Sequence, residues 1–399
     1  MTDKRYWIWL SKCLGEGAKF KEIIEDFGSV EKLYESNILE WRMSPALNAK
    51  QIEKLSKLKL DISDEIIEEC KQNFWSIITY DDEAYPQRLR EISNPPAVLY
   101  VEGEIGDIEN TAAVAIVGTR RASTYALKAA HIMAKGIALC SCAVISGGAI
   151  GVDSASHRGA LEAGGKTYAV LGCGLGADYL RENEDLRREI VSSGGALITE
   201  YPPHTPATKF TFPMRNRIIS GLSLGTLVVE AGEKSGSLIT ANFAAEQDRD
   251  IFAIPASIFD SNFLGTNLLI NDGAIVATSP SVIVNQYAER YGLDESKALS
   301  VKELAEIGKK QKENTPKKDQ ISFDTMPQDR VKRVDLSKKA LDLPDNEKAV
   351  FNALSDELQV IEAIAEKANM NINEVLASLT LLEMKGLIIS ASGRRYKIR

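Results

Sequence analysis

Six short apolar runs recur in the middle of the chain, and each is followed by sequence that can form a helix. They read AVAIVG, CAVISGG, KTYAVLGCG, GALITEY, GTLVVEA and DIFAIPA, and they fall between residues 113 and 256. The apolar residues of each run are consecutive, which is typical of strands covered by helices on both faces. Strands that alternate with helices predict an α/β fold with an extended, Rossmann-like, doubly wound sheet. We expect this domain to span residues 74–286.

Residues 1–73 form a separate helical module in this interpretation. Trp7, Leu10 and Leu14 share one stripe at helical spacing, and a second stripe follows from Phe20. Short helices joined by a glycine-containing turn resemble helix-hairpin-helix and SAM-like modules, whose turn amides can contact a DNA backbone. The turn here, LGEGAK, carries Glu16 where such a turn prefers an apolar residue. A module that only packs against the rest of the protein is an equal alternative.

Two further regions follow the sheet domain. Residues 287–342 are rich in charge and poor in large apolar residues, which predicts a flexible linker. Residues 343–399 hold three helical segments and two short strands joined around Gly393, which describe a winged helix. The charged residues of the third helical segment are Glu374, Glu383 and Lys385. A helix that reads a major groove needs a basic, polar face, so we favour a protein-contact or auxiliary role.

Composition narrows the class of protein. The net charge of -8 argues against a wholly basic surface, but a nucleic-acid site needs only a local cationic patch. The five cysteines are scattered and form no CxxC pair, which predicts a reduced, cytoplasmic compartment and no structural metal site. Cys140 and Cys142 are expected to pack at a helix end and a strand start. Neither a signal peptide nor a membrane span is predicted.

Three glycine-bearing loops follow predicted strands: VGTRRAST (117–124), SGGAIGVD (146–153) and GCGLG (172–176). Ligands of an open α/β sheet bind beyond these strand ends, where glycine lets backbone amides approach a phosphate closely. The loops lack the GxGxxG fingerprint with its ribose-binding acid, and the chain has no GxxxxGK[ST]. We therefore predict no cofactor. Any one loop taken alone is equally consistent with a tight connection.

The segment KFTFPMRNR (209–217) brings cations and aromatic rings together. Guanidinium groups present forked donors to phosphate oxygens, and a helix predicted to begin near Ser237 would direct free amides at another oxyanion. Tyr179, Phe210 and Phe212 would offer faces to unstacked bases, a combination that suits single-stranded nucleic acid. The alternative is that both phenylalanines are core residues and that the arginines are solvated.

His157 and Asp153 share a helix face, which raises the question of catalysis. An acid that caps its own helix, beside a packed histidine, is the commoner explanation of this spacing. The sequence shows no third group that would position such a pair. We therefore predict no catalytic residue.

Five motifs occur in an order that resembles the DprA/Smf family of DNA-processing proteins. They read VGTRRAST, SGGAIGVDSASHRGALEAGG, GCGLGADYLREN, TEYPPHTPATKFTFPMRNRIISGLS and VVEAGEKSGSLITANFAAEQDRDIFAIP. The similarity runs from about Tyr80 to Ala277, and the helical module and the winged helix fit the family's layout. The resemblance implies a Rossmann-like domain that binds single-stranded DNA, self-associates and helps to load the RecA recombinase during natural transformation.

The resemblance also assigns binding residues. The arginine of the family's VG[ST]R motif is Arg120, and the basic residue after a tyrosine–proline pair is Arg181, with Leu180 in place of the proline. Ala256 stands where the family usually has glycine. Together with the residues proposed above, the expected nucleic-acid contacts are Gly118, Thr119, Arg120, Arg121, Ser146, Gly147, Tyr179, Arg181, Lys209, Phe210, Phe212, Arg215, Asn216 and Arg217.

The segment GTNLLINDGAIV (265–276) lies where the family's dimer contact falls. Leu269, Ile270 and Val276 would supply its apolar surface, and ordinary core packing is an equal alternative.

The residues favour a cytoplasmic binder of single-stranded DNA without catalytic turnover, and the resemblance implies that it is a homodimer that protects incoming strands and loads RecA. The single-strand-binding protein is a further candidate partner. The rival is a nucleotide-processing enzyme of the lysine-decarboxylase-like Rossmann group, which uses a PGGxGT segment and a glutamate. This chain has EAGEKSGSLIT at that strand end, and Glu230 is the nearby acid. A third hypothesis is a scaffold that bridges recombinase and replication proteins through the winged helix.

Overall fold

The computed structural model describes residues 3–15, 17–179, 181–306, 343–355, 359–385, 387–391 and 395–398. The chain divides into two compact units, Met1–Asn314 and Thr315–Arg399. Each unit has a hydrophobic core of its own.

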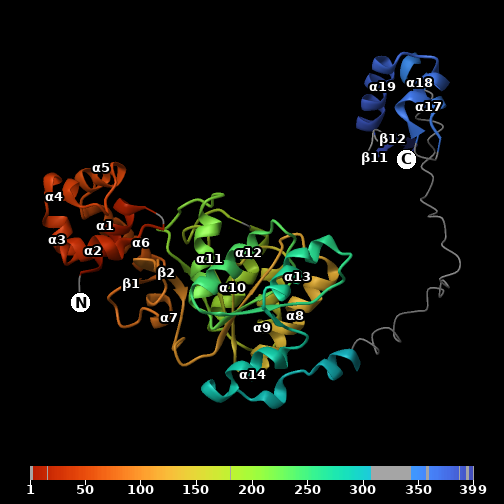
Figure 1. The fold of residues 1–399 in the computed structure, drawn as a ribbon. Coiled ribbons are helices and arrows are strands. Elements are labelled where there is room, and N and C mark those ends of the chain that lie inside the picture. Colours follow the sequence, from red (N-terminus) through yellow and green to blue (C-terminus); the bar gives the residue numbers. More distant parts are fainter. Residues whose placement is uncertain are drawn as a thin grey trace. The chain divides into compact units, whose positions relative to one another are not determined.

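A mostly parallel sheet forms the centre of the first unit (Figure 1). Its strand order is β1-β2-β6-β5-β4-β3-β7-β8-β9, and β3 to β9 run parallel. The strands are β1 Ser76–Thr79, β2 Val98–Gly103, β3 Ala113–Val117, β4 Ala143–Ser146, β5 Thr167–Val170, β6 Ala196–Thr199, β7 Gly225–Val228, β8 Asp250–Ala253 and β9 Ile275–Val276. The six predicted runs correspond to β3 to β8, which confirms the α/β fold. The two residues of β9 were not predicted.

The sheet has a topological switch point between β3 and β7. From β3 the chain proceeds to β4, β5 and β6 on one side, and it then returns to place β7 on the other side of β3. The loops after β3 and β7 consequently diverge to opposite faces and leave a crevice at the carboxyl edge of the sheet, where open α/β folds bind ligands.

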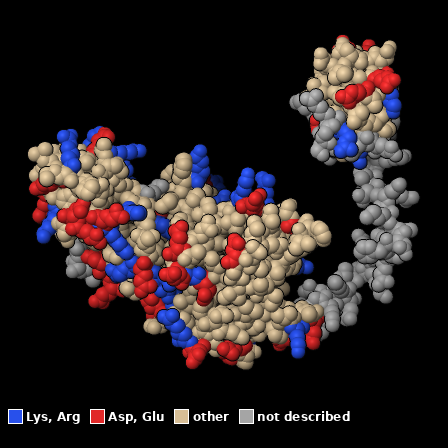
Figure 2. Space-filling model, viewed as in Figure 1, with Lys and Arg blue, Asp and Glu red and all other residues tan. Residues whose placement is uncertain are grey.

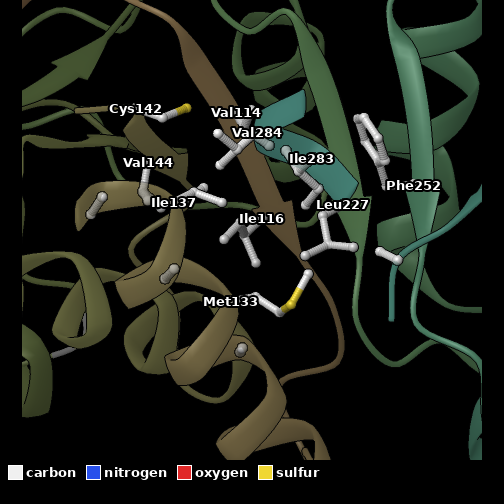
Figure 3. Packing of buried hydrophobic residues seen from close by; sticks show 14 of the residues in the cluster. Val114, Ile116, Met133, Ile137, Cys142, Val144, Leu227, Phe252, Ile283 and Val284 are labelled. Atoms are coloured by element: carbon white, nitrogen blue, oxygen red, sulfur yellow. The ribbon is translucent and has the colours of Figure 1, made fainter. Parts of the chain in front are cut away.

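Helices cover both faces of the sheet because alternate strand residues point to opposite sides. Val114 and Ile116 of β3 pack with α8 (Thr124–Leu139) and α14 (Pro280–Tyr291), as Figure 3 shows. Ala113 and Ala115 belong to the core of the other face. That face is covered by α11 (Thr211–Gly221) and α12 (Gly236–Glu246), while α9 (Val152–Glu162) packs beside α8.

The N-terminal residues form a confirmed helical region that shares its core with the sheet. Its helices are α1 Lys4–Leu14, α2 Phe20–Phe27, α3 Val30–Glu35, α4 Ile38–Met43, α5 Ala49–Lys57 and α6 Asp61–Gln72. Trp7 packs edge-on against Phe20, with 5.5 Å between ring centroids, and lies in one cluster with Tyr100 and Leu171 of the sheet domain. The helices are therefore packed on the sheet. Within the turn LGEGAK, for which DNA contact and plain packing were equal alternatives, Glu16 lies outside the described residues.

The predicted linker start at residue 287 falls inside α14. Tyr287 is buried, and its hydroxyl donates a hydrogen bond to Asp250 Oδ2 at 2.7 Å. Ala298 also belongs to the core, so the packed chain extends past the predicted boundary. The linker prediction for residues 307–342 lies outside the described residues.

The second unit is a winged helix, as predicted. It comprises α17 Asp345–Ala353, β10 Gln359–Val360, α18 Ile361–Ala368, α19 Ile372–Met384, β11 Ile388–Ala391 and β12 Arg395–Ile398, with strand order β10-β12-β11. Strand β10 was not predicted. Helix α19 exposes the apolar residues Ile372, Leu376 and Leu381, and it also exposes Glu374 and Glu383. The Lys385 ammonium pairs with Glu347 at 2.6 Å. The described surface of α19 is therefore part apolar and part acidic where a groove-reading helix would be basic.

Candidate nucleic-acid interface

A cavity of about 450 Å³ lies at the topological switch point. We call it the switch-point cavity. The loop after β3, the first turns of α9 and α11, and the N-terminus of α12 form its walls. Seven of the predicted contacts line this cavity: Gly118, Thr119, Arg120, Arg121, Phe212, Arg215 and Asn216. Helix α12 begins at Gly236, which confirms the predicted helix start near Ser237.

Hydrogen bonds to Glu230 fix the β3–α8 loop. This buried carboxylate accepts hydrogen bonds from Ser123 N at 2.9 Å and Ser123 Oγ at 2.6 Å. Thr119 N donates to the Glu230 carbonyl oxygen at 2.9 Å. A Cβ on Gly118 would come within 2.6 Å of Val152, so the loop passes too close to α9 for any larger residue. These contacts hold Arg120, which is exposed, at the mouth of the cavity.

Arg120, Phe212 and Tyr179 contact one another in a row beside the cavity, and we call this row the ladder. The Arg120 guanidinium lies over the Phe212 ring, with Cζ 4.5 Å from the centroid. Phe212 is 5.3 Å from the Tyr179 ring, at a tilt of 45°. Phe212 and Tyr179 are both half-buried, so each ring packs on one side and remains accessible on another. A cation beside two accessible rings fits a phosphate with neighbouring unstacked bases.

Arg215 forms the floor of the cavity. It is buried, and its Nη1 donates to the carbonyl oxygens of Gly147, at 2.8 Å, and Val170. A Cβ on Gly147 would lie 2.6 Å from Arg215 Nη2. Burial lowers the pKa of Arg215, while burial raises the pKa of Asp153 against the opposing charge of Arg215. Arg215 therefore supplies positive charge to the cavity and also ties the β4–α9 loop to the sheet.

Two buried predicted contacts, Ser146 and Arg217, do not line the switch-point cavity. Arg217 is 2% exposed, and its guanidinium is bound by Glu200. Ser146 is fully buried, and its Oγ donates to the Ile116 carbonyl oxygen at 2.6 Å. The expectation that these side chains contact nucleic acid directly does not fit this arrangement, because each is buried and already has a protein partner. Their role here is structural.

Three other predicted contacts lie outside the switch-point cavity. Arg181 is exposed and donates from Nε and Nη2 to the two Asp178 oxygens, both at 2.7 Å. Phe210 is 68% exposed, and the Lys209 ammonium lies 5.1 Å from its ring centroid. Leu180, which replaces the family's proline before Arg181, lies outside the described residues. The sequence suggested Glu230 only as a possible catalytic acid. Its role in anchoring the β3–α8 loop was not predicted.

His157 is a core residue. It is fully buried, and its Nδ1 lies 2.7 Å from Thr167 Oγ1. Burial lowers the pKa of His157 to about 3, so the ring is neutral at physiological pH. The nearby Asp153 accepts a hydrogen bond from Ala149 N at 3.3 Å at the start of α9. The contacts of the two residues fit the non-catalytic interpretation of their spacing.

All five cysteines are free and buried. Cys140 caps the C-terminus of α8, and Cys142 directly precedes β4, as predicted. Burial raises the pKa of the Cys142 thiol to about 12, which makes it unreactive. Among the described residues, no cluster of His, Cys, Asp and Glu side chains could hold a metal ion, and no helix could cross a membrane.

An apolar surface lies around α13 (Leu264–Asn271), in an area where Figure 2 shows few charged side chains. Of the predicted dimer residues, Val276 is 40% exposed, while Leu269 and Ile270 are half-buried. The most exposed apolar residues nearby were not predicted. They are Ile258, Phe259, Leu264 and Leu268.

Comparison with known proteins agrees with this fold. A family model described as DNA recombination-mediator protein A matches residues 76–288, and one described as the DprA winged helix domain matches residues 336–394. Protein Smf of Escherichia coli (strain K12) is 33% identical over 323 residues, which cover 81% of this chain and 77% of that protein. The DNA processing protein DprA of Bacillus subtilis (strain 168) is 40% identical over 213 residues, covering 53% and 71%.

A solved structure shows the same arrangement. The X-ray structure of DNA processing protein A (DprA) from Streptococcus pneumoniae matches with a TM-score of 0.62 and 32% identity. The match covers 72% of this chain and 99% of that one. Sequence and structure together establish that this chain belongs to the DprA/Smf family of DNA-processing proteins and carries the family's winged-helix domain.

Proposed function

We propose that this protein binds single-stranded DNA as a recombination mediator, protects incoming strands and loads the RecA recombinase during natural transformation, without catalytic turnover. The observation that carries the DNA-binding part is the ladder of Arg120, Phe212 and Tyr179 at the mouth of the switch-point cavity. The cavity is lined by three arginines and one acid, Asp153, although the chain as a whole is acidic. A local cationic site of this kind attracts phosphate without making the protein basic overall.

The same geometry favours single strands over duplex DNA. Rings that lie beside a phosphate site can stack only on bases that are free of a partner strand, and stacking tolerates any base. Phosphate contacts likewise carry little sequence information. We therefore expect binding with a weak sequence preference and a strong dependence on salt.

The test is a titration of an oligonucleotide across a salt series with the wild type and Arg120→Ala. Since Arg120 is exposed and its guanidinium packs on the Phe212 ring, its removal should leave the fold intact and weaken binding by about tenfold. The slope of log K against log salt should become shallower by about 0.7. Lys128→Ala, which removes an exposed cation of α8 outside the cavity, is the matched control. Binding that ignores salt, or that survives Arg120→Ala unchanged, would contradict the proposal.

Self-association and partners belong to the same proposal. The apolar surface around α13 supports a homodimer, and two linked sites would bind one strand more tightly than either alone. RecA and the single-strand-binding protein are proposed partners in a cytoplasmic setting, which five free cysteines favour. The exposed apolar side chains of α19 support a protein-contact role for the winged helix.

The rival function is hydrolysis of nucleoside monophosphates, with Glu230 as the acid. Glu230 is 2% exposed, and its Oε2 is bound to Ser123, so it lacks access to a substrate in this arrangement. Incubation with nucleoside monophosphates and detection of released base would test this directly. Turnover that disappears in Glu230→Gln would revive the enzyme hypothesis.

A further inference from the structure

A second cavity, of about 490 Å³, opens beside Tyr179, and we call it the Trp75 cavity. Its walls are formed by Trp75, by β2 and β6, by the loop after β5 and by helix α10 (Glu184–Ser192). Trp75 and Tyr179 line it together with the apolar side chains Leu171, Leu175 and Leu197. Tyr179 also contacts Phe212, which lines the switch-point cavity. The two cavities therefore meet across a pair of aromatic rings.

The charges of the two cavities differ. The switch-point cavity has an excess of arginine, whereas the Trp75 cavity is lined by three arginines and three acids. Two of these arginines are paired locally: Arg181 with Asp178, and Arg188 with Glu184. A cavity with balanced charge and aromatic and aliphatic walls suits a neutral, flat group better than a phosphate.

Two polar groups stand among these apolar walls. Glu102 is half-buried and hydrogen-bonded to Trp75, and burial raises the pKa of its carboxyl against the opposing effect of Arg187. The Tyr179 hydroxyl is buried and has no hydrogen-bond partner among the described residues.

We propose that the Trp75 cavity binds one unstacked base of the DNA strand whose phosphates lie in the switch-point cavity, with Glu102 accepting a hydrogen bond from the base's amino group. The inference rests on the proposed function and adds a base preference to it. Cytosine, adenine and guanine each carry an amino donor, and Glu accepts from cytosine N4 in known complexes. Thymine offers two carbonyl oxygens and one ring N–H, which suit a carboxylate less well.

The fluorescence emission of Trp75 can report whether the Trp75 cavity is occupied. The chain has four tryptophans, and Trp7, Trp9 and Trp41 are at most 7% exposed, whereas Trp75 is half-buried. Oligocytidine should therefore quench tryptophan emission in the wild type and leave it unchanged in Trp75→Phe. Trp75→Ala should weaken oligocytidine binding by about fivefold or more, because a stacked base is lost. Phe74→Ala, which removes an exposed ring outside the cavity, is the matched control and should bind normally.

Glu102→Gln tests the base preference without removing a ring. The wild type should bind oligocytidine about fivefold more tightly than oligothymidine of equal length, and Glu102→Gln should reduce this ratio. Strand binding with no change in emission, and with Trp75→Ala equal to the wild type, would overturn the inference while leaving the proposed function standing. Failure of every strand to bind the wild type would overturn both.

Discussion

Arg217 and Glu200 form a forked ion pair in the interior of the first unit. Nη1 lies 2.7 Å from Oε1 and Nη2 lies 2.7 Å from Oε2, and both side chains are buried. Although burial opposes its charge, the Glu200 carboxylate raises the pKa of Arg217. The pair joins the end of β6 to α11, so it sets the position of the helix that carries Phe212 and Arg215.

We expect Arg217→Ala to lower the free energy of unfolding by about 3–5 kcal/mol, because the substitution leaves the Glu200 carboxylate buried without a partner. Urea denaturation followed by tryptophan emission measures this, since all four tryptophans lie in the first unit. The double variant Arg217→Met, Glu200→Leu is the control and should recover much of the loss. A stable Arg217→Ala protein that binds DNA weakly would instead mean that Arg217 contacts the strand.

Sequence alone could predict the strands but not which arginines would face the ligand. Consecutive apolar residues identify β3 to β8 because parallel strands are buried on both faces, and β9 escaped because two residues carry no such pattern. Arg215 and Arg217 look alike in the sequence and differ in their partners. Arg217 is bound to the carboxylate of Glu200, which lies 17 residues away along the chain. Arg215 donates to backbone carbonyl oxygens at the ends of β4 and β5. Which partner each arginine contacts depends on tertiary packing, and no local sequence motif encodes that packing.

His157 should make the first unit sensitive to acid. Its pKa of about 3 in the fold lies below its ordinary value of 6.5, so between these values the unfolded chain binds a proton that the folded chain does not. Its contribution is complete above pH 6.5 and is lost as the pH falls, by up to about 1.4 kcal/mol per pH unit. Urea midpoints of the wild type should fall faster with acid than those of His157→Gln. Parallel pH profiles would contradict this assignment.

Leu268 tests the proposed dimer surface. It is 44% exposed on α13, so Leu268→Glu should leave the monomer's core unchanged but place a charge in any contact formed there. Analytical ultracentrifugation should show a shift toward monomer, together with weaker binding to long strands. Leu127→Glu, at a similarly exposed position on α8, is the control and should not alter the assembly. Unchanged sedimentation of Leu268→Glu would exclude this surface.

Asp178 should restrain DNA binding through Arg181. Its carboxylate holds the guanidinium in a forked pair and thereby reduces the positive charge offered to a phosphate. Asp178→Asn should therefore tighten strand binding by about twofold to threefold at low salt, and the gain should vanish at high salt because exposed charges are screened. The double variant Asp178→Asn, Arg181→Ala should show no gain. A gain that persists in the double variant would mean that Asp178 acts by general repulsion and not through Arg181.

Phe212 should contribute to binding in two ways, since its ring supports the Arg120 guanidinium and lies against Tyr179. Phe212→Leu keeps much of the apolar volume but removes the aromatic face, so affinity for single strands should fall by about 1–3 kcal/mol. Phe212→Tyr keeps that face and should bind nearly as the wild type does. If stacking is the main contribution, the loss in Phe212→Leu will persist at high salt, where the Arg120→Ala effect shrinks. Equal salt dependence of the two losses would indicate that Phe212 acts only by positioning Arg120.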